Sequence, residues 1–239
     1  LPTESSWSDE WRETTLQLYT VGAEVELALG HIDTMERYSK KVLSKNETCT
    51  TLERFPLYLV ELFKLSTIDQ NRRETHRFCL AVLKELIGHR FVTFQSTVPL
   101  QAVVALKDVI TKAKTKAKSE YESLPKMNDL RQEAIMKALH RFVTNCFLSR
   151  KKFLFVLSAC RMVSITLKYG ISEYAGTAFS VLGQLTFLSD PKTASYFGEI
   201  ALLLQERIGS RFSESNTVYF VVSFIFPWTK QLHDCLSSS

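Results

Sequence analysis

The chain has 239 residues, of which 45% are hydrophobic and 23% are charged, as in ordinary globular proteins. Its 8 glycines and 6 prolines are too few for the turns of a protein built from many short strands, so long helices are favoured. The net charge of +5, from 30 basic and 25 acidic residues spread along the chain, argues for solubility and does not indicate a nucleic-acid-binding protein.

The five cysteines are widely separated, and no two of them form a C-x-x-C pair. This spacing is typical of reduced thiols in the core of a cytosolic protein, not of a disulfide framework or a zinc site. No apolar run reaches the roughly 18 residues that span a bilayer. We therefore expect a cytoplasmic protein without membrane insertion. Because the chain opens at Leu1 and closes on three serines, we also expect a fragment of a longer protein.

Apolar residues at helical spacing predict about ten helices. The first follows a cap at Ser8 and ends at Gly30, and the second is capped by Asp33. The remaining helices are expected at residues 57–65, 72–87, 98–121, 130–149, 149–169, 173–188, 192–208 and 213–235, the last of them broken or kinked near Pro227.

Two stretches share the pattern of a helix, a tight turn and a second helix packed back on the first. They are residues 19–43, with a turn at Gly30, and residues 178–204, with a turn at residues 189–191. Tetratricopeptide repeats use this arrangement. We expect an all-α fold in which antiparallel helix pairs stack as a tetratricopeptide-like right-handed α-solenoid. Residues 1–239 would form a single helical-repeat domain with a possible sub-division near residues 122–129.

Four short stretches, in this order, carry a resemblance to one family. They are residues 124–129 (LPKMND), 167–172 (LKYGIS), 197–202 (FGEIAL) and 226–230 (FPWTK). The chain resembles the helical, tetratricopeptide-like region of very large multi-domain signalling proteins. In those proteins a kinase-like domain and an AAA-type ATPase precede the helical region, and sensor modules and often a histidine kinase or nucleotide cyclase follow it.

The resemblance extends over about residues 16–236 and is best in the C-terminal half. The chain departs from the family at Phe226-Pro227, where a histidine is expected just before Trp228. It also has Ser189-Asp190 in place of a Gly-Asp turn, so the local turn geometry can differ. The resemblance implies a regulatory or interaction segment of a signal-transduction protein and does not imply catalysis.

Long catalytic signatures are missing from the sequence. It contains no G-x-x-x-x-G-K-[ST] loop for phosphates, no H-R-D and D-F-G pair, no H-E-x-x-H and no G-x-S-x-G. We therefore expect no enzymatic activity and no catalytic, cofactor-binding or metal-binding residues. The expected role is a non-enzymatic scaffold that binds proteins.

The residues that we expect to contact a protein partner are Trp7, Trp11, Glu24, Glu26, Arg37 and Trp228. Trp7 and Trp11 would cover the first helix pair or remain exposed where a neighbouring domain docks. The three charged residues would lie on the inner face of that pair. Trp228, in a phenylalanine-rich helix, fits core packing as well as a partner contact.

Two other functions remain open. The first is a helical sensor that binds a small apolar ligand in a pocket lined by Phe179, Phe187, Phe197, Phe220 and Phe224. The second is a homo-oligomerisation module, such as a homodimer, that uses the apolar last helix. Nucleic-acid binding is not expected, because single-stranded nucleic acids are usually bound by aromatic residues interleaved with cations. Here the aromatic residues near the basic clusters fall on apolar faces.

Overall fold

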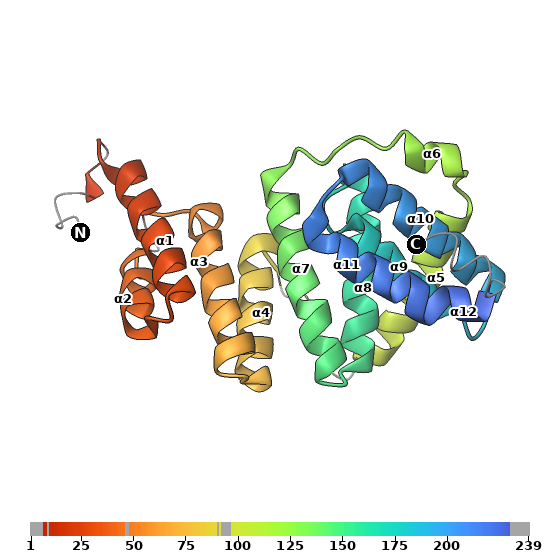
Figure 1. Cartoon of the computed structure of the whole chain (residues 1–239), viewed down its shortest axis with the longest axis horizontal. Helices are drawn as coiled ribbons and strands as arrows, with labels where there is room; N and C mark the ends of the chain where they lie inside the picture. Colours follow the sequence, from red (N-terminus) through yellow and green to blue (C-terminus); the bar gives the residue numbers. More distant parts are fainter. Residues whose placement is uncertain (1–6, 9, 46–47, 90, 92–96, 230–239) are drawn as a thin grey trace. The chain divides into compact units, whose positions relative to one another are not determined.

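The computed structural model describes residues 7–8, 10–45, 48–89, 91 and 97–229, and the chain divides into two compact units, Leu1–Phe91 and Val92–Ser239. The fold is all-α, with antiparallel contacts between consecutive helices in both units (Figure 1). The expected sub-division near residues 122–129 lies inside the second unit. Each unit is described by itself below.

The first unit contains four α-helices and one π-helical turn within its described residues. They are α1 (Arg12–Ala28), α2 (Ile32–Leu43), α3 (Thr51–Phe63), η2 (Lys64–Ile68) and α4 (Arg72–Ile87). The expected pair at residues 19–43 is confirmed, because α1 packs against α2. Helix α3 then packs against α1, α2 and α4, so each helix contacts its neighbours in chain order.

Three helix starts in this unit differ from the sequence prediction. Helix α1 begins at Arg12, with Trp11 and not Ser8 at the cap position. Helix α2 begins at Ile32, with His31 and not Asp33 at the cap position. Helix α3 begins six residues before the expected position 57, because Thr50 and Glu53 form a reciprocal capping box that satisfies the first free amides. Pro56 therefore lies inside the helix and not near its first turn.

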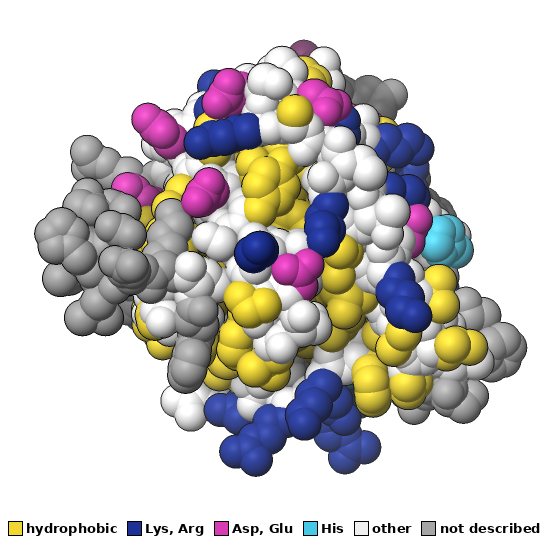
Figure 2. Space-filling view, turned by 90° about the vertical axis from the view of Figure 1, so that its right-hand side faces the viewer, with side chains coloured by type: hydrophobic (Ala, Val, Ile, Leu, Met, Phe, Trp, Pro, Cys, Tyr) yellow, Lys and Arg dark blue, Asp and Glu magenta, His cyan; other side chains and the backbone are white. Residues whose placement is uncertain are grey.

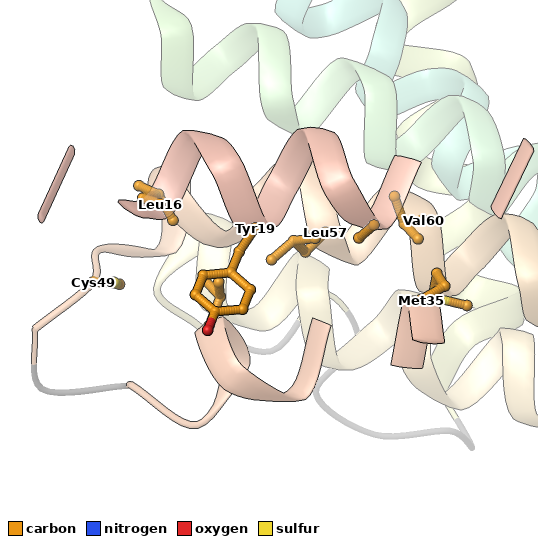
Figure 3. Close-up of a cluster of buried hydrophobic side chains, with 8 residues drawn as sticks. Leu16, Tyr19, Met35, Cys49, Leu57 and Val60 are labelled. Carbon is orange, nitrogen blue, oxygen red and sulfur yellow. The ribbon is translucent and has the colours of Figure 1, made fainter. Parts of the chain in front are cut away.

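The core of the first unit is a cluster contributed by α1, α2, α3 and the preceding loop (Figure 3). Its buried members are Leu16, Tyr19, Ala23, Met35, Val42, Cys49, Leu57 and Val60. Tyr19 extends from α1 toward α2, and its hydroxyl points away from α1. Burial of these side chains supplies most of the stability of such a small unit.

The second unit is formed by the later helices. They are α5 (Val98–Lys114), α6 (Lys118–Glu122), α7 (Leu130–Leu148), α8 (Lys152–Tyr169), α9 (Ala175–Thr186), α10 (Pro191–Ile208), α11 (Arg211–Phe220), η4 (Val221–Ile225) and α12 (Phe226–Thr229). The expected pair at residues 178–204 is confirmed by the contact of α9 with α10. Asp190 caps α10 by accepting from the amide of Thr193 at 3.1 Å, as the Asp-Pro sequence predicts.

Helix α9 is the centre of the second unit. It contacts α8, α10, α11 and η4, and every residue from 175 to 183 is buried. Small residues allow this close packing: a Cβ added at Gly183 would lie 2.6 Å from the Cδ1 of Ile225. The glycines and alanines at the expected crossing of α9 and α10 therefore have a packing role.

The expected helix at residues 98–121 is two helices, because α5 ends at Lys114 and α6 begins at Lys118. The break brings Tyr121 back over α5, where its buried hydroxyl donates to the carbonyl of Ala113 at 2.9 Å. The expected last helix at residues 213–235 is α11, η4 and α12 as far as Thr229, and residues 230–239 lie outside the described part.

Candidate interaction surfaces of the first helix pair

Helix α1 has two apolar faces. One face carries Leu16, Tyr19 and Ala23 into the core of the first unit. The other, which we call the α1 stripe, consists of large apolar side chains that are between 49% and 63% exposed: Trp11, Leu18, Val21, Val25 and Leu29. At 3.6 residues per turn the two faces point about 140° apart. The core contacts of α1 therefore leave the stripe uncovered.

An acidic edge runs along the α1 stripe. Glu13 and Glu24 are eleven residues apart, so they lie on one line along the helix, and both are exposed. Neither forms an ion pair with another side chain in the described ranges. The stripe is thus bordered on one side by carboxylates that are available to a cationic partner.

A hollow of about 610 Å³ lies between α1 and α2, and we call it the α2 hollow. Its floor is aromatic, formed by Tyr19 and Tyr38, whose rings meet edge-on at 5.9 Å. Its rim is formed by exposed polar and basic side chains of α2: Arg37, Lys40, Lys41 and Ser44. The ring of Tyr38 lies directly against α1, because a Cβ added at Gly22 would come within 3.1 Å of it.

The cations of the rim differ in how far they are neutralised. Lys40 pairs with Glu36 at 3.1 Å, but Glu36 also pairs with Lys64 at 2.6 Å. The hydrogen bonds from Lys64 and then Lys40 lower the pKa of the Glu36 carboxyl. Arg37 donates to the hydroxyl of Thr34 at 3.1 Å, and neither Arg37 nor Lys41 pairs with a carboxylate of the described part of the chain. The rim therefore keeps a positive charge.

The structure separates the two N-terminal tryptophans that the sequence suggested together. Trp7 stacks on Tyr19, with ring centroids 5.9 Å apart, and the ammonium of Lys45 lies 5.7 Å from the Trp7 ring. Trp7 therefore covers the core, whereas Trp11 is the first residue of the α1 stripe and is 55% exposed.

The predicted charged residues fall on different surfaces. Glu24 borders the α1 stripe, and Arg37 belongs to the rim of the α2 hollow. Glu26 accepts a hydrogen bond from the Nδ1 of His31 at 2.8 Å across the turn between α1 and α2. Trp228 belongs to α12, and its side chain lies outside the described part. The structure therefore does not bring the five predicted residues of the first unit into one site.

The residues predicted from the sequence to contact a partner include only Trp11 of the five in the α1 stripe. The missed signal is a second set of apolar residues at helical spacing, Leu18, Val21, Val25 and Leu29, which leaves α1 apolar on two sides. Lys40 and Lys41 were also missed, because basic residues near the end of a helix are common.

Four of the five phenylalanines of the expected ligand pocket form two pairs of rings in contact. Phe179 and Phe197 are fully buried and contact each other with centroids 6.3 Å apart. Phe220 and Phe224 contact each other at 5.8 Å and join Tyr219 and Phe147. Packing among these rings accounts for four of the five residues.

A shorter apolar patch lies on α5 of the second unit, where Leu100, Val103 and Val104 are exposed within little more than one helical turn. The face of the molecule shown in Figure 2 mixes hydrophobic, basic and acidic side chains, with a group of basic side chains at its lower edge. The α1 stripe extends over five turns and is bordered by one kind of charge. It is therefore the stronger candidate for a binding surface.

Among the described residues, no helix is long and apolar enough to cross a membrane, and no group of three or more His, Cys, Asp or Glu side chains is placed to hold a metal ion. Four of the five cysteines, Cys49, Cys79, Cys146 and Cys160, are buried free thiols, and Cys235 lies outside the described part. Comparisons with protein-family models, with curated proteins and with solved structures each found no match.

Proposed function

We propose that the chain is a non-enzymatic protein-interaction scaffold of a multi-domain signal-transduction protein, and that the α1 stripe is its main binding surface. The observation that carries this proposal is the exposure of five large apolar side chains along one face of α1. Contiguous exposed apolar surface of this kind marks interaction sites on soluble proteins.

The fold we propose for the first unit is a tetratricopeptide-like α-solenoid. Its support is the packing of α1 to α4 in chain order, since each repeat of a solenoid contacts mainly its neighbours. In such a stack α3 covers one side of the α1–α2 pair. The outer face of α1 is then the place where a further helix can be added.

The partner we propose is an amphipathic helix of another domain or protein. The stripe from Trp11 to Leu29 is about 27 Å long at 1.5 Å per residue, which matches a partner helix of about five turns. The carboxylates of Glu13 and Glu24 favour a partner with lysine or arginine beside its apolar face. Trp11 is the expected anchor, because tryptophan is enriched among residues that dominate binding energy.

Light scattering on the whole chain, alone and mixed with the neighbouring domains of its parent protein, tests the proposal. We expect a complex that the double substitution Val21→Asp and Val25→Asp weakens by about tenfold or more, since it buries charge at the centre of the contact. Leu130→Asp with Leu188→Asp is the charge-matched control, because these two side chains are 71% and 86% exposed and lie outside the stripe.

A complex that survives the double substitution with unchanged affinity would contradict the proposal. Circular dichroism before and after the substitution confirms that α1 remains helical. A stable homodimer of the unmodified chain, with no affinity for the neighbouring domains, would instead assign the stripe to assembly of the parent protein.

A further inference from the structure

We propose that the α2 hollow is a second binding site, which takes an acidic peptide segment of a partner protein. This inference is independent of the α1 stripe, because it rests on different side chains and on the opposite charge. The hollow combines a volume of about 610 Å³, two aromatic rings at its floor and three cations at its rim.

The chemistry of the hollow selects a short peptide with acidic and apolar side chains. The rim cations Arg37 and Lys41, which have no carboxylate partner within the described ranges, would bind carboxylates of Asp or Glu. The ring of Tyr38, half-buried at the floor, offers a surface for an apolar side chain between them. The Ser44 hydroxyl at the rim donates to the carbonyl of Lys41 at 3.2 Å, and its oxygen would accept from a backbone amide of the peptide.

The openness of the hollow favours a peptide over a small anionic molecule. Four of the six lining residues are exposed, so a ligand would lie across the hollow and not be enclosed by it. Tight sites for small molecules usually bury most of the surface of their ligand. A peptide makes further contacts along the helix beyond the hollow itself.

The surrounding charges also favour an acidic partner. Helix α2 carries two carboxylates. Asp33 lies in its first turn, one turn before Arg37 and two turns before Lys41, and Glu36 is held by Lys64 of η2 at 2.6 Å. Lys45, at the end of α2, adds a further cation beside the Trp7 ring. The acidic edge of the α1 stripe would repel the same ligand, so the two surfaces serve different partner segments.

Fluorescence anisotropy with the whole chain tests the inference directly. The probe is a fluorescein-labelled peptide of ten residues with the sequence EDEFEDEFED, used at low salt, where exposed charges are least screened. The comparison probes are KKKFKKKFKK and a labelled oligonucleotide of ten thymidines. We expect the unmodified chain to bind the acidic peptide more tightly than the oligonucleotide. Binding of the basic peptide is expected at the α1 stripe, so it should be unchanged in variants of the α2 hollow.

Two charge-matched variants distinguish an effect of the hollow on peptide binding from an effect of the net charge of the chain. Arg37→Glu with Lys41→Glu changes the rim, and Arg73→Glu with Lys84→Glu makes the same change in net charge on exposed positions of α4. We expect the first variant to weaken binding of the acidic peptide by about tenfold and the second by less than about twofold. Tyr38→Ala tests the aromatic floor, and we expect it to weaken binding without changing the salt dependence.

Three results would overturn the inference. The first is no binding of the acidic peptide, and the second is an equal loss in the two charge-matched variants. The third is binding of the oligonucleotide as tight as that of the peptide, which would make the hollow a site for nucleic acid. The variants in α2 leave the α1 stripe unchanged. A failure of this inference is therefore distinguishable from a failure of the proposed scaffold function.

Discussion

Pro125 and Ile171 are joined through their backbones. The amide of Ile171 donates to the carbonyl oxygen of Pro125 at 2.8 Å, and the amide of Met127 donates to the carbonyl of Ile171 at 2.9 Å. These bonds tie the loop after α6 to the end of α8 as one isolated parallel bridge. Residues 124–129 and 167–172, which are far apart in the sequence, therefore form one junction of the second unit.

Gly170 makes this junction possible, and Gly170→Ala is expected to destabilise the second unit by about 2–4 kcal/mol. Its backbone has φ of 100° and ψ of −177°, a region that only glycine adopts easily. A Cβ at this position would also collide with the carbonyl oxygen of Pro125, a backbone atom that cannot rotate away. Urea denaturation, followed by the fluorescence of the buried tyrosines, measures the loss.

Gly209→Ala is the control for this prediction. Gly209 also has a positive φ, of 65°, but a Cβ there would meet nothing within 4 Å. We expect a loss of only about 1 kcal/mol from the backbone conformation alone. Equal effects at the two glycines would show that the contact with Pro125 does not matter.

Much of the fold could be predicted from the sequence, because capping residues, prolines and glycines mark many helix boundaries. Asp190-Pro191, Asp129 and Gly88 mark the ends of helices, and the structure uses each of them. The predicted starts of α1, α2 and α3 were wrong. At α3 the capping box at Thr50 and Glu53 outweighs Pro56, which the helix accommodates in its interior.

The candidate surfaces were harder to predict, because exposure depends on what the fold leaves uncovered. Val21 and Val25 look like core residues in the sequence, and they are exposed because α2 and α3 cover a different face of α1. The α2 hollow needs Tyr19 of α1 beside Arg37 and Lys41 of α2, a proximity that no single helix pattern contains.

Arg12 sets the ionisation of Glu53, and Arg12→Met is expected to raise the pKa of that carboxyl toward its ordinary 4.5. The guanidinium donates to Glu53 at 2.6 Å and to the carbonyl of Thr48 at 2.8 Å. The hydrogen bond from Arg12, with that from the Thr50 amide, lowers the pKa of Glu53 to about 2. A pH titration of the Glu53 carboxyl carbon by NMR in both proteins measures the change.

The sign of the accompanying stability effect follows from the lowered pKa. The contribution of Glu53 is complete above pH 4.5 and is lost as the pH falls toward 2, because the unfolded state takes up the proton first. Because Arg12→Met raises the pKa of Glu53 in the folded state, it should narrow the pH range over which this contribution to stability is lost. An unchanged titration of Glu53 in the variant would mean that the cap at Thr50 alone holds the carboxylate.

His140 is expected to make the second unit less stable in mild acid. The ring is buried on α7, lies 4.6 Å from the ring of Tyr174, and has an Nδ1 without a hydrogen-bond partner among the described residues. Burial, with a smaller effect of Arg141, lowers the pKa of His140 to about 4 from 6.5. The unfolded state therefore binds a proton over a pH range in which the folded state does not.

The loss of stability begins as the pH falls below 6.5 and is complete near pH 4, and it amounts to about 3 kcal/mol. His140→Phe removes the titrating group and keeps an aromatic ring beside Tyr174. We expect the variant to lose less stability than the unmodified chain between pH 7 and pH 4.5 in hydrogen exchange of α7 and α8. Parallel pH profiles for the two proteins would contradict this assignment.

Trp7 and Trp11 are expected to respond differently to the same substitution. Trp7→Ala removes the ring stacked on Tyr19 and the contact with Lys45, so we expect it to destabilise the first unit by about 1–2 kcal/mol. Trp11→Ala removes a side chain that is 55% exposed, and its effect on stability should be within about 0.5 kcal/mol. Thermal and urea unfolding of both variants measure the difference. If Trp11→Ala is the more destabilising of the two, Trp11 stabilises the fold of the first unit and is not available as a binding residue of the α1 stripe.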